Sequence, residues 1–384
     1  MSVGADQMLE EWEEMQANTL DASTEPLSLG ARDPQSGRLI LSPKRTLPTA
    51  KAYVREFHQH NEGRTLRSHH GSLIHWQDNR YIEIEDATVK HRLLPWLHDA
   101  VRPQVSRSTG ETVLTDFDAN PTTVNHALES IRTYVHLDEQ VASPCWLDGR
   151  TDPPADELIP CRTLNLHVPT GCVIPATPAL FNVNALDFDF DPHAPEPMWW
   201  LNFLADLLGD DAESIELLQE WFGYCLGGDT SQQKILLLVG PRRSGKGTIG
   251  RVLTRLVGDG NVANPTTASL AGTFGLQPLI AKSLAIVSDA RFSGEGVPTV
   301  VERCLNISGE DRITIDRKFL PSVTMKLPTR FMLLTNELPR LKDASIALAG
   351  RFLVVHLQEL LRKREPHPDP EIVRGVAGDS VVGD

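Results

Sequence analysis

The stretch that decides the fold is Ile235-Leu236-Leu237-Leu238-Val239-Gly240-Pro241-Arg242-Arg243-Ser244-Gly245-Lys246-Gly247-Thr248. Its five apolar residues predict a buried strand, a glycine-bounded loop follows, and a helix is expected to begin at Lys246. This strand–loop–helix order is typical of a P-loop, in which backbone N–H groups and a helix N-terminus surround a polyphosphate. The alternative is a glycine-rich loop that binds nothing, but the strand before it and the helix-compatible segment after it favour a phosphate site.

Each residue type in this loop has its own chemical role. Gly240 and Gly245 allow the backbone to approach phosphates closely, and Lys246 carries the charge that reaches the β- and γ-phosphates. Gly247 stands where Ser or Thr usually follows the lysine, so Thr248 is the predicted hydroxyl of the Mg2+ shell. The predicted nucleotide-binding residues are Gly240, Pro241, Arg242, Arg243, Ser244, Gly245, Lys246, Gly247 and Thr248.

A P-loop needs a second strand that ends in a carboxylate, which holds Mg2+ or polarises water. The apolar run 284–287 is followed by Ser288 and Asp289, so Asp289 is the predicted metal and catalytic acid. Ser288 replaces the other acid of the usual pair. Either Asp289 serves both metal and water, or a nearby acid such as Glu295 or Glu302 assists.

Two further polar residues flank apolar strands. Asn336 follows the run 329–335, where an amide can bind the γ-phosphate or orient the attacking water. The alternative for Asn336 is a turn at the end of the strand. Arg351 precedes the apolar run 352–355, and an arginine placed there can stabilise transition-state charge, usually from a neighbouring subunit. The alternative for Arg351 is a surface position.

Composition and charge limit the class of protein. The 384 residues predict two to three domains. No apolar run reaches the length of a membrane span, and the five cysteines contain no CxxC pair, which favours reduced thiols in a cytoplasm. The net charge of −14 is uneven: residues 1–30 carry seven acids and no Lys or Arg, whereas residues 291–351 carry ten Lys/Arg against seven Asp/Glu. The second region is compatible with binding a phosphodiester backbone.

The chain organisation follows from periodicity. A hairpin is predicted to turn at Asp78-Asn79, with helices after it and near 122–134, and two amphipathic helices are expected over 199–208 and 212–226. The acids Asp187, Asp189 and Asp191 alternate, which favours surface strand acids over a metal site because no calcium-loop framework accompanies them. The predicted segments are an acidic flexible arm over 1–35 with a short helix around Leu9–Met15, an accessory domain over 46–198, an ATPase core over 199–356 and a frayed tail over 357–384.

These motifs together resemble a known family. The segment from about Ile215 to Val355 is similar to the ATPase core of superfamily 3 helicases, in particular the phage/plasmid primase–helicases related to poxvirus and satellite-phage replication proteins. Four elements match in order: GPRRSGKGT, LAIVSDAR, SGEDRITIDRK, and PTRFMLLTNELPRL followed by GRF. The third resembles the family's segment that carries a DNA-contacting hairpin. The region from about Thr46 to Met198 is more loosely similar to the family's accessory domain.

The resemblance implies an α/β fold: a P-loop, AAA+-like ATPase core with a mainly parallel sheet, preceded by an α+β accessory domain. It also implies a homo-hexameric ring that binds ATP and Mg2+, hydrolyses ATP at subunit interfaces and moves along single-stranded DNA. Lys246, Asp289, Asn336 and Arg351 would take the catalytic roles, and Arg317 and Lys318 would contact the DNA backbone. Arg242 and Ser244 depart from the Gly and Asn frequent in the family's loop. No primase catalytic domain is recognisable, so a separate primase or other replisome proteins are the expected partners.

The leading hypothesis is therefore an ATP-dependent DNA helicase or translocase of phage, plasmid or integrated-element replication, in the cytoplasm of a bacterium or of a virus-infected host cell. Two alternatives remain. One is a degenerate ATP-binding scaffold of a replisome, which the single acid at Asp289 favours. The other is a P-loop nucleotide kinase, because the sequence GKGT also occurs in such enzymes.

Overall fold

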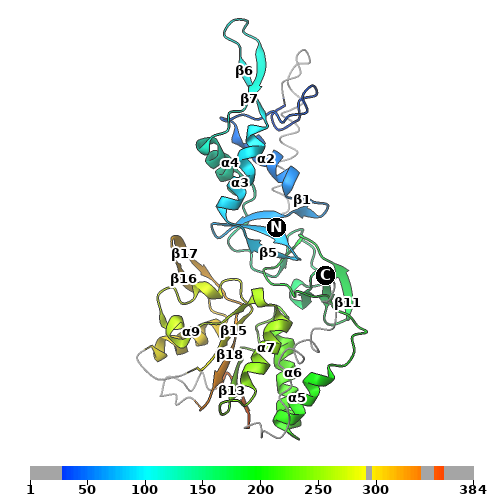
Figure 1. Ribbon diagram of the computed structural model, residues 1–384, viewed down its shortest axis with the longest axis vertical. Helices are drawn as coiled ribbons and strands as arrows, with labels where there is room; N and C mark the ends of the chain where they lie inside the picture. Colours follow the sequence, from blue (N-terminus) through cyan, green and yellow to red (C-terminus); the bar gives the residue numbers. More distant parts are fainter. Residues whose placement is uncertain (1–27, 291–295, 339–349, 359–384) are drawn as a thin grey trace. The chain divides into compact units, whose positions relative to one another are not determined.

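The computed structural model describes residues 28–290, 296–338 and 350–358 (Figure 1). The chain forms two compact units: residues up to 152 with 177–181 make the first, and residues 153–176 with those from 182 onward make the second. Most of the predicted arm and tail lies outside the described residues. The four segment boundaries given by sequence stay a prediction.

The described part of the first unit packs three helices around one apolar core. The helices are α2 (Thr46–Phe57), α3 (Asp86–His98) and α4 (Pro121–Tyr134), and Tyr53, Leu93 and Ile131 are among the side chains that they bury. The α4 helix begins at Asn120, whose side chain accepts hydrogen bonds from the N–H groups of Thr122 and Thr123. The two helices predicted after the hairpin are confirmed.

The β-structure of the first unit is antiparallel. Strands β3 (Leu66–His69), β4 (Ser72–Gln77) and β5 (Arg80–Glu83) form a meander. Asp78 and Asn79 join β4 to β5 with positive φ angles of 47° and 57°, which is the backbone of a tight hairpin turn and confirms the predicted one. The described residues of this unit also form three two-stranded ribbons: β1 (Gln59–His60) with β2 (Gly63–Arg64), β6 (Val101–Val105) with β7 (Thr112–Asp116), and β8 (Cys145–Trp146) with β12 (Leu180–Phe181).

A five-stranded parallel sheet forms the centre of the second unit. The strands lie in the order β14-β15-β18-β13-β19, and each neighbouring pair is parallel. This mixed α/β arrangement confirms the predicted, mainly parallel sheet. The strands are β13 (Ile235–Val239), β14 (Val262–Ala263), β15 (Leu284–Val287), β18 (Arg330–Thr335) and β19 (Phe352–His356).

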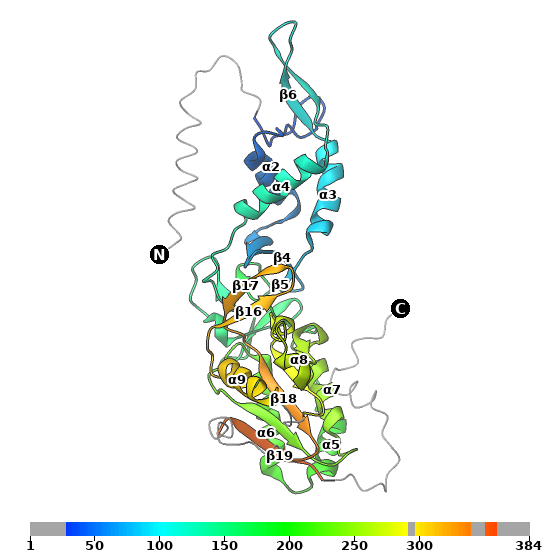
Figure 2. The ribbon, with the colours of Figure 1, turned by 90° about the vertical axis from the view of Figure 1, so that its left-hand side faces the viewer.

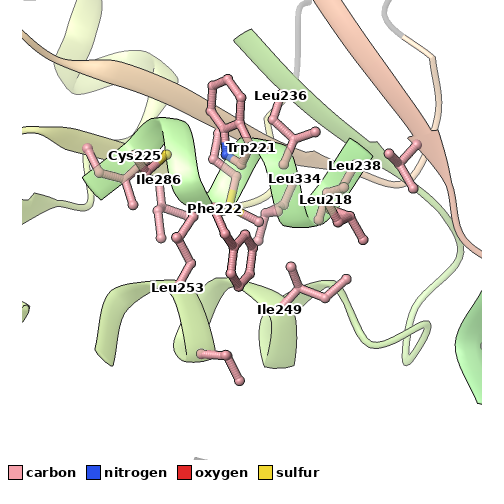
Figure 3. Packing of buried hydrophobic residues seen from close by; sticks show 14 of the residues in the cluster. Leu218, Trp221, Phe222, Cys225, Leu236, Leu238, Ile249, Leu253, Ile286 and Leu334 are labelled. Carbon is pink, nitrogen blue, oxygen red and sulfur yellow. The ribbon is translucent and has the colours of Figure 1, made fainter. Parts of the chain in front are cut away.

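Both faces of this sheet are buried, and the strand periodicity explains how. In β13 the side chains of Leu236 and Leu238 enter one core, while Ile235, Leu237 and Val239 enter the other. Figure 3 shows the first core, where Leu236, Leu238, Ile286 and Leu334 from three strands meet side chains of two helices. A strand buried on both faces reads as an unbroken apolar run, which is why the sequence 235–239 identified it.

Helices cover the two faces (Figures 1 and 2). One face is covered by α5 (Met198–Leu208), α6 (Ala212–Leu226) and α7 (Lys246–Val257), and the other by α8 (Thr267–Ala271), α9 (Val297–Ser308) and the hairpin of β16 (Ile313–Arg317) with β17 (Leu320–Met325). The helices predicted over 199–208 and 212–226 are confirmed. Among the described residues, no helix has the length and apolar character that a membrane crossing requires.

A small antiparallel sheet, β11-β10-β9, precedes these helices and comprises Cys172–Pro175, Leu164–His167 and Leu158–Pro160. The predicted strand character of the acids 187–191 is wrong, because these residues form no strand. Instead the Asp189 carboxylate accepts hydrogen bonds from the backbone N–H of Thr163 at 2.8 Å and from its hydroxyl at 2.7 Å. Asp189 therefore fastens a loop to the start of β10.

Candidate nucleotide site and hairpin

Three of the predicted site segments meet at one edge of the sheet. They follow β13, β15 and β18, and the carboxyl ends of parallel strands lie on the same edge, where open α/β sheets bind ligands. The backbone N–H of Gly240 donates to Thr335 O at 3.2 Å, and that of Ala290 donates to Leu334 O at 2.8 Å. The loop after β13, the loop after β15 and the end of β18 are therefore adjacent.

The loop 240–245 needs glycine at both ends. A Cβ added to Gly240 would lie 2.6 Å from Leu357 O and 2.8 Å from Ser244 Oγ, so a side chain does not fit there. Gly245 has a φ of +78°, a left-handed conformation that costs other residues free energy. Arg243 also has a positive φ, of 65°. Left-handed residues within a loop turn successive backbone N–H groups toward one side, and the resulting concavity suits anions.

Lys246 begins α7 and its ammonium lies inside the loop. Nζ donates to the carbonyl oxygens of Gly240 and, at 2.7 Å, of Pro241, and it contacts Ser244 Oγ at 3.2 Å. It also reaches Asn336 Oδ1 at 3.3 Å. The structure thus brings together two residues that the sequence proposed as catalytic, 90 positions apart along the chain.

The acid predicted to hold the metal also lies near this ammonium. Partial burial lowers the pKa of Lys246, because it disfavours the charged form, and the negative charge of Asp289 opposes that effect. Asp289 is exposed and has a φ of 54°. The strained backbone turns the chain sharply at the end of β15, which places this carboxylate at the carboxyl edge.

The first turn of α7 carries the predicted hydroxyl ligand. The backbone N–H of Thr248 donates to Gly245 O at 3.0 Å, and its Oγ1 accepts a hydrogen bond from Arg251 Nη2 at 3.1 Å. Arg251, one turn further along α7, was not identified from the sequence. It adds a cation close to the residues expected to meet phosphates.

Asn336 is held by its neighbour. Thr335 is buried, and its hydroxyl donates to Glu337 O at 2.8 Å. This contact fixes the chain as it leaves β18, so the exposed Asn336 amide projects at the strand end toward Lys246. The chain bends at Asn336, as the turn interpretation expects, and the amide still reaches Lys246, so its functional role stays a prediction.

Arg351 lies at the opposite edge of the sheet. Its backbone O accepts from the N–H of Ile235, the first residue of β13. Five residues of β13 then separate it from the loop, a span of about 16 Å along the strand. The guanidinium is part-buried and donates through Nη1 to Leu305 O at 2.6 Å and to Ser308 Oγ at 2.7 Å. Within one chain it therefore binds the C-terminal turn of α9 and does not join the other predicted catalytic residues.

The predicted DNA-contacting residues form the end of a hairpin, which confirms the predicted β-hairpin. Strands β16 and β17 are antiparallel, with a register shift between Ile315 and Arg317. Phe319 has a φ of 64° and is 93% exposed, and Lys318 Nζ lies 5.1 Å from the centre of its ring. Arg317 Nε donates to Pro321 O at 2.8 Å. The tip thus presents a cation and an aromatic face side by side.

Besides Arg251, the sequence did not identify the residues that pack behind the loop or anchor the start of β18. A Cβ on Gly245 would lie 3.1 Å from Phe203 Cζ and 3.4 Å from both Leu207 Cδ atoms, so α5 packs directly behind the loop. Arg330 is buried at the start of β18, donates to the carbonyl oxygens of Gly227 (at 2.8 Å) and Asp229, and lies over the Tyr224 ring. The sequence did offer one sign of the role of Arg330, because a charged residue is unusual at the start of a strand that is otherwise apolar.

These contacts predict the effect of Gly245→Ala. The left-handed backbone and the Phe203 ring both oppose a methyl group, so the loop must shift, at a cost of about 1–2 kcal/mol. We expect nucleotide affinity, measured by titration with a fluorescent ATP analogue, to fall about tenfold or more. Gly223→Ala in α6 is the matched control, because nothing lies within 4 Å of its added Cβ. Unchanged affinity in Gly245→Ala would contradict the placement of α5 behind the loop.

Comparisons with known proteins agree with this fold. A model of a family of unknown function, DUF5906, matches residues 238–347. The A-form apo structure of the NrS-1 C-terminal region superposes with a TM-score of 0.51 at 16% identity, over 81% of this chain and 63% of that one. A second structure of that region, covering residues 305–718, gives a TM-score of 0.50 at 15% identity, over 86% and 66%.

The comparisons therefore define a fold class. This chain shares its α/β architecture with the NrS-1 C-terminal region and spans about 63% of the length of the first of those structures. A JCV helicase structure gives a TM-score of 0.31 at 17% identity, over 42% of this chain and 45% of that one, which is too low to define a shared fold.

Proposed function

We propose that this chain is an ATP-driven DNA helicase or translocase of mobile-element replication, which hydrolyses ATP at the interfaces of a homo-hexameric ring. The observation that carries the proposal is the carboxyl edge of the sheet. There a glycine-bounded loop, a helix N-terminus and the contact of Lys246 with Asn336 lie together. The helicase-type order of the motifs and the cations on the hairpin support single-stranded DNA as the polymer along which the protein moves.

The loop suits ATP and Mg2+ chemically. A side chain in place of Gly240 or Gly245 would collide with neighbouring atoms, so only glycine keeps the loop in its tight curve. The Lys246 ammonium lies where β- and γ-phosphates would meet the loop. Mg2+ bound with phosphates needs only one or two carboxylates together with waters. Thr248 and Asp289 would supply that small set, so a lone acid is sufficient. Bound Mg2+ would neutralise phosphate charge, while Lys246 and Asn336 bind and orient the polyphosphate.

The experiment that tests this proposal is an ATPase assay with and without single-stranded DNA, run beside a sizing measurement. We expect hydrolysis that single-stranded DNA stimulates, in a species of hexamer size. Phosphate transfer to a nucleotide would instead identify a kinase. Nucleotide binding with turnover equal to that of Lys246→Ala would identify a scaffold.

The hairpin tip gives a prediction about DNA. Replacing Arg317 and Lys318 together with alanine should weaken single-stranded DNA binding, because cations at a hairpin tip neutralise phosphates and release counterions. The slope of log K against log salt should flatten by roughly 1.4 per engaged subunit. Fluorescence anisotropy with a labelled oligonucleotide at several salt concentrations measures both quantities. ATP hydrolysis without DNA should persist, since neither residue contacts the phosphate loop.

The matched control is Arg312→Ala. Arg312 lies at the root of the same hairpin and donates to Thr324 O at 3.1 Å, away from the tip. Its loss should leave the salt slope unchanged. If the double variant keeps the wild-type slope, or if Arg312→Ala flattens it equally, the hairpin tip is not the DNA contact.

A further inference from the structure

The first unit contains an open groove with a volume of about 640 Å³ between the segment 28–31 and the N-terminal half of α2. Arg45, Lys51 and Arg55 line it, and none of the described lining residues carries a carboxylate. The first turn of α2 has no acidic residue, so the positive end of the helix adds to this charge. The groove is therefore an electropositive surface.

The groove has a fixed wall and an apolar component. Arg55 Nη2 donates to Gly30 O at 2.6 Å, and the N–H of Gly30 donates to Ile40 O at 2.8 Å, which together hold the wall in place. Leu29 and Leu47 also line the groove, and Leu47 is 46% exposed. A ligand that fits must carry negative charge together with apolar groups.

We propose that the groove binds the acidic segment 8–15 of the same chain. This segment reads Met-Leu-Glu-Glu-Trp-Glu-Glu-Met and thus alternates pairs of carboxylates with apolar side chains. Its charge is opposite to that of the groove, and it carries no Lys or Arg. The groove would pair with its carboxylates through the three cations and cover its apolar side chains with the two leucines.

The place where the segment joins the described chain favours binding within one molecule. Ser28 is the first described residue and itself lines the groove. Twelve residues separate Met15 from Ser28. A linker of that length spans on the order of 20 Å as a random coil and about 40 Å at full extension. A tether of that length gives an effective concentration on the order of millimolar, so even weak ion pairing suffices to fill the groove.

Such binding has a consequence for the chain's interactions. While acidic side chains occupy the groove, they exclude other anions, above all nucleic-acid phosphates, from Arg45, Lys51 and Arg55. The arm thereby keeps this surface from competing with the hairpin of the second unit for DNA. Because the contact is electrostatic and exposed, it weakens as salt rises.

Carbodiimide cross-linking of the intact chain tests the proposal without ATP, so its outcome is independent of the helicase assignment. The reagent joins a lysine amine to a carboxylate in contact with it as an amide and takes up the released water as a urea. We expect peptide mass spectrometry to find Lys51 joined to Glu10, Glu11, Glu13 or Glu14. The yield should fall several-fold in high salt and in Arg45→Glu.

Three controls make the result decisive. Lys44 is exposed beside the groove without lining it, so Lys44→Glu should leave the Lys51 cross-link unchanged. A mixture of 15N-labelled and unlabelled chains should give only links within one isotope. Changing the four glutamates to glutamine should remove the link.

Other outcomes overturn the proposal. Mixed-isotope links would show that the arm binds a second copy of the chain. Equal links from Lys44 and Lys51 would show unspecific attraction. If Lys51 forms no link with the arm, and Arg45→Glu instead weakens binding of a labelled oligonucleotide, the groove is a nucleic-acid site.

Discussion

Replacing Lys246 with alanine is expected to abolish ATP hydrolysis and to weaken ATP binding. The Lys246 ammonium lies inside the loop, bound to loop carbonyls and to Asn336. It is the cation that the motif directs at the β- and γ-phosphates, which would lose this partner in the variant. A coupled phosphate-release assay measures hydrolysis, and titration with a fluorescent ATP analogue measures binding.

The fold should survive this substitution, because the Lys246 side chain belongs to the site and not to either apolar core. Its pKa is already lowered by partial burial, so removal of the ammonium also relieves a desolvation cost. A thermal melt within a few degrees of the wild type is therefore expected. Wild-type turnover in a well-folded Lys246→Ala variant would refute the phosphate-site assignment.

The local parts of this fold could be predicted from sequence. The strand 235–239, the turn at Asp78-Asn79 and the helices before β13 follow from apolar periodicity and from residues that tolerate positive φ, which are properties of neighbours in the chain. A parallel sheet followed from strands that are apolar on both faces. That β18 lies between β13 and β15 could not be read from these patterns, because strand order depends on long-range packing.

The supporting residues were missed for the same reason. Phe203 lies behind Gly245 although about forty positions separate them, and nothing local marks an aromatic residue in an apolar helix as part of a site. Arg330 stands near the start of the predicted strand 329–335, yet it is buried and binds the end of α6. The direction of the Arg351 side chain likewise depends on α9, which the sequence did not connect with it.

The Arg351→Ala variant gives the second large expected effect. The Arg351 backbone pairs with the first residue of β13, about 16 Å along the strand from the loop of its own chain, so any action on phosphate requires the loop of a neighbouring subunit. If it acts in this way, Arg351→Ala should bind ATP normally and lose hydrolysis by ~10^3-fold or more, as for other arginines supplied across an interface. Turnover at saturating ATP and the affinity for the fluorescent analogue separate the two effects.

The contacts with α9 require a control for stability. Loss of the bonds to Leu305 O and Ser308 Oγ will loosen the C-terminal turn of α9, at a cost of about 1–3 kcal/mol. Ser308→Ala removes one of these acceptors and leaves the guanidinium in place. It should lower the melting temperature but retain most of the turnover, which a purely structural role of Arg351 would not allow.

Mixing the two inactive variants distinguishes a neighbour's arginine from a local defect. An interface between an Arg351→Ala subunit, which keeps Lys246, and a Lys246→Ala subunit, which keeps Arg351, contains one intact site. Hydrolysis should therefore reappear when the variants are mixed under conditions in which labelled subunits exchange. If exchange occurs and activity does not return, the site is complete within one chain, the ring model is wrong, and Arg351 serves α9 alone.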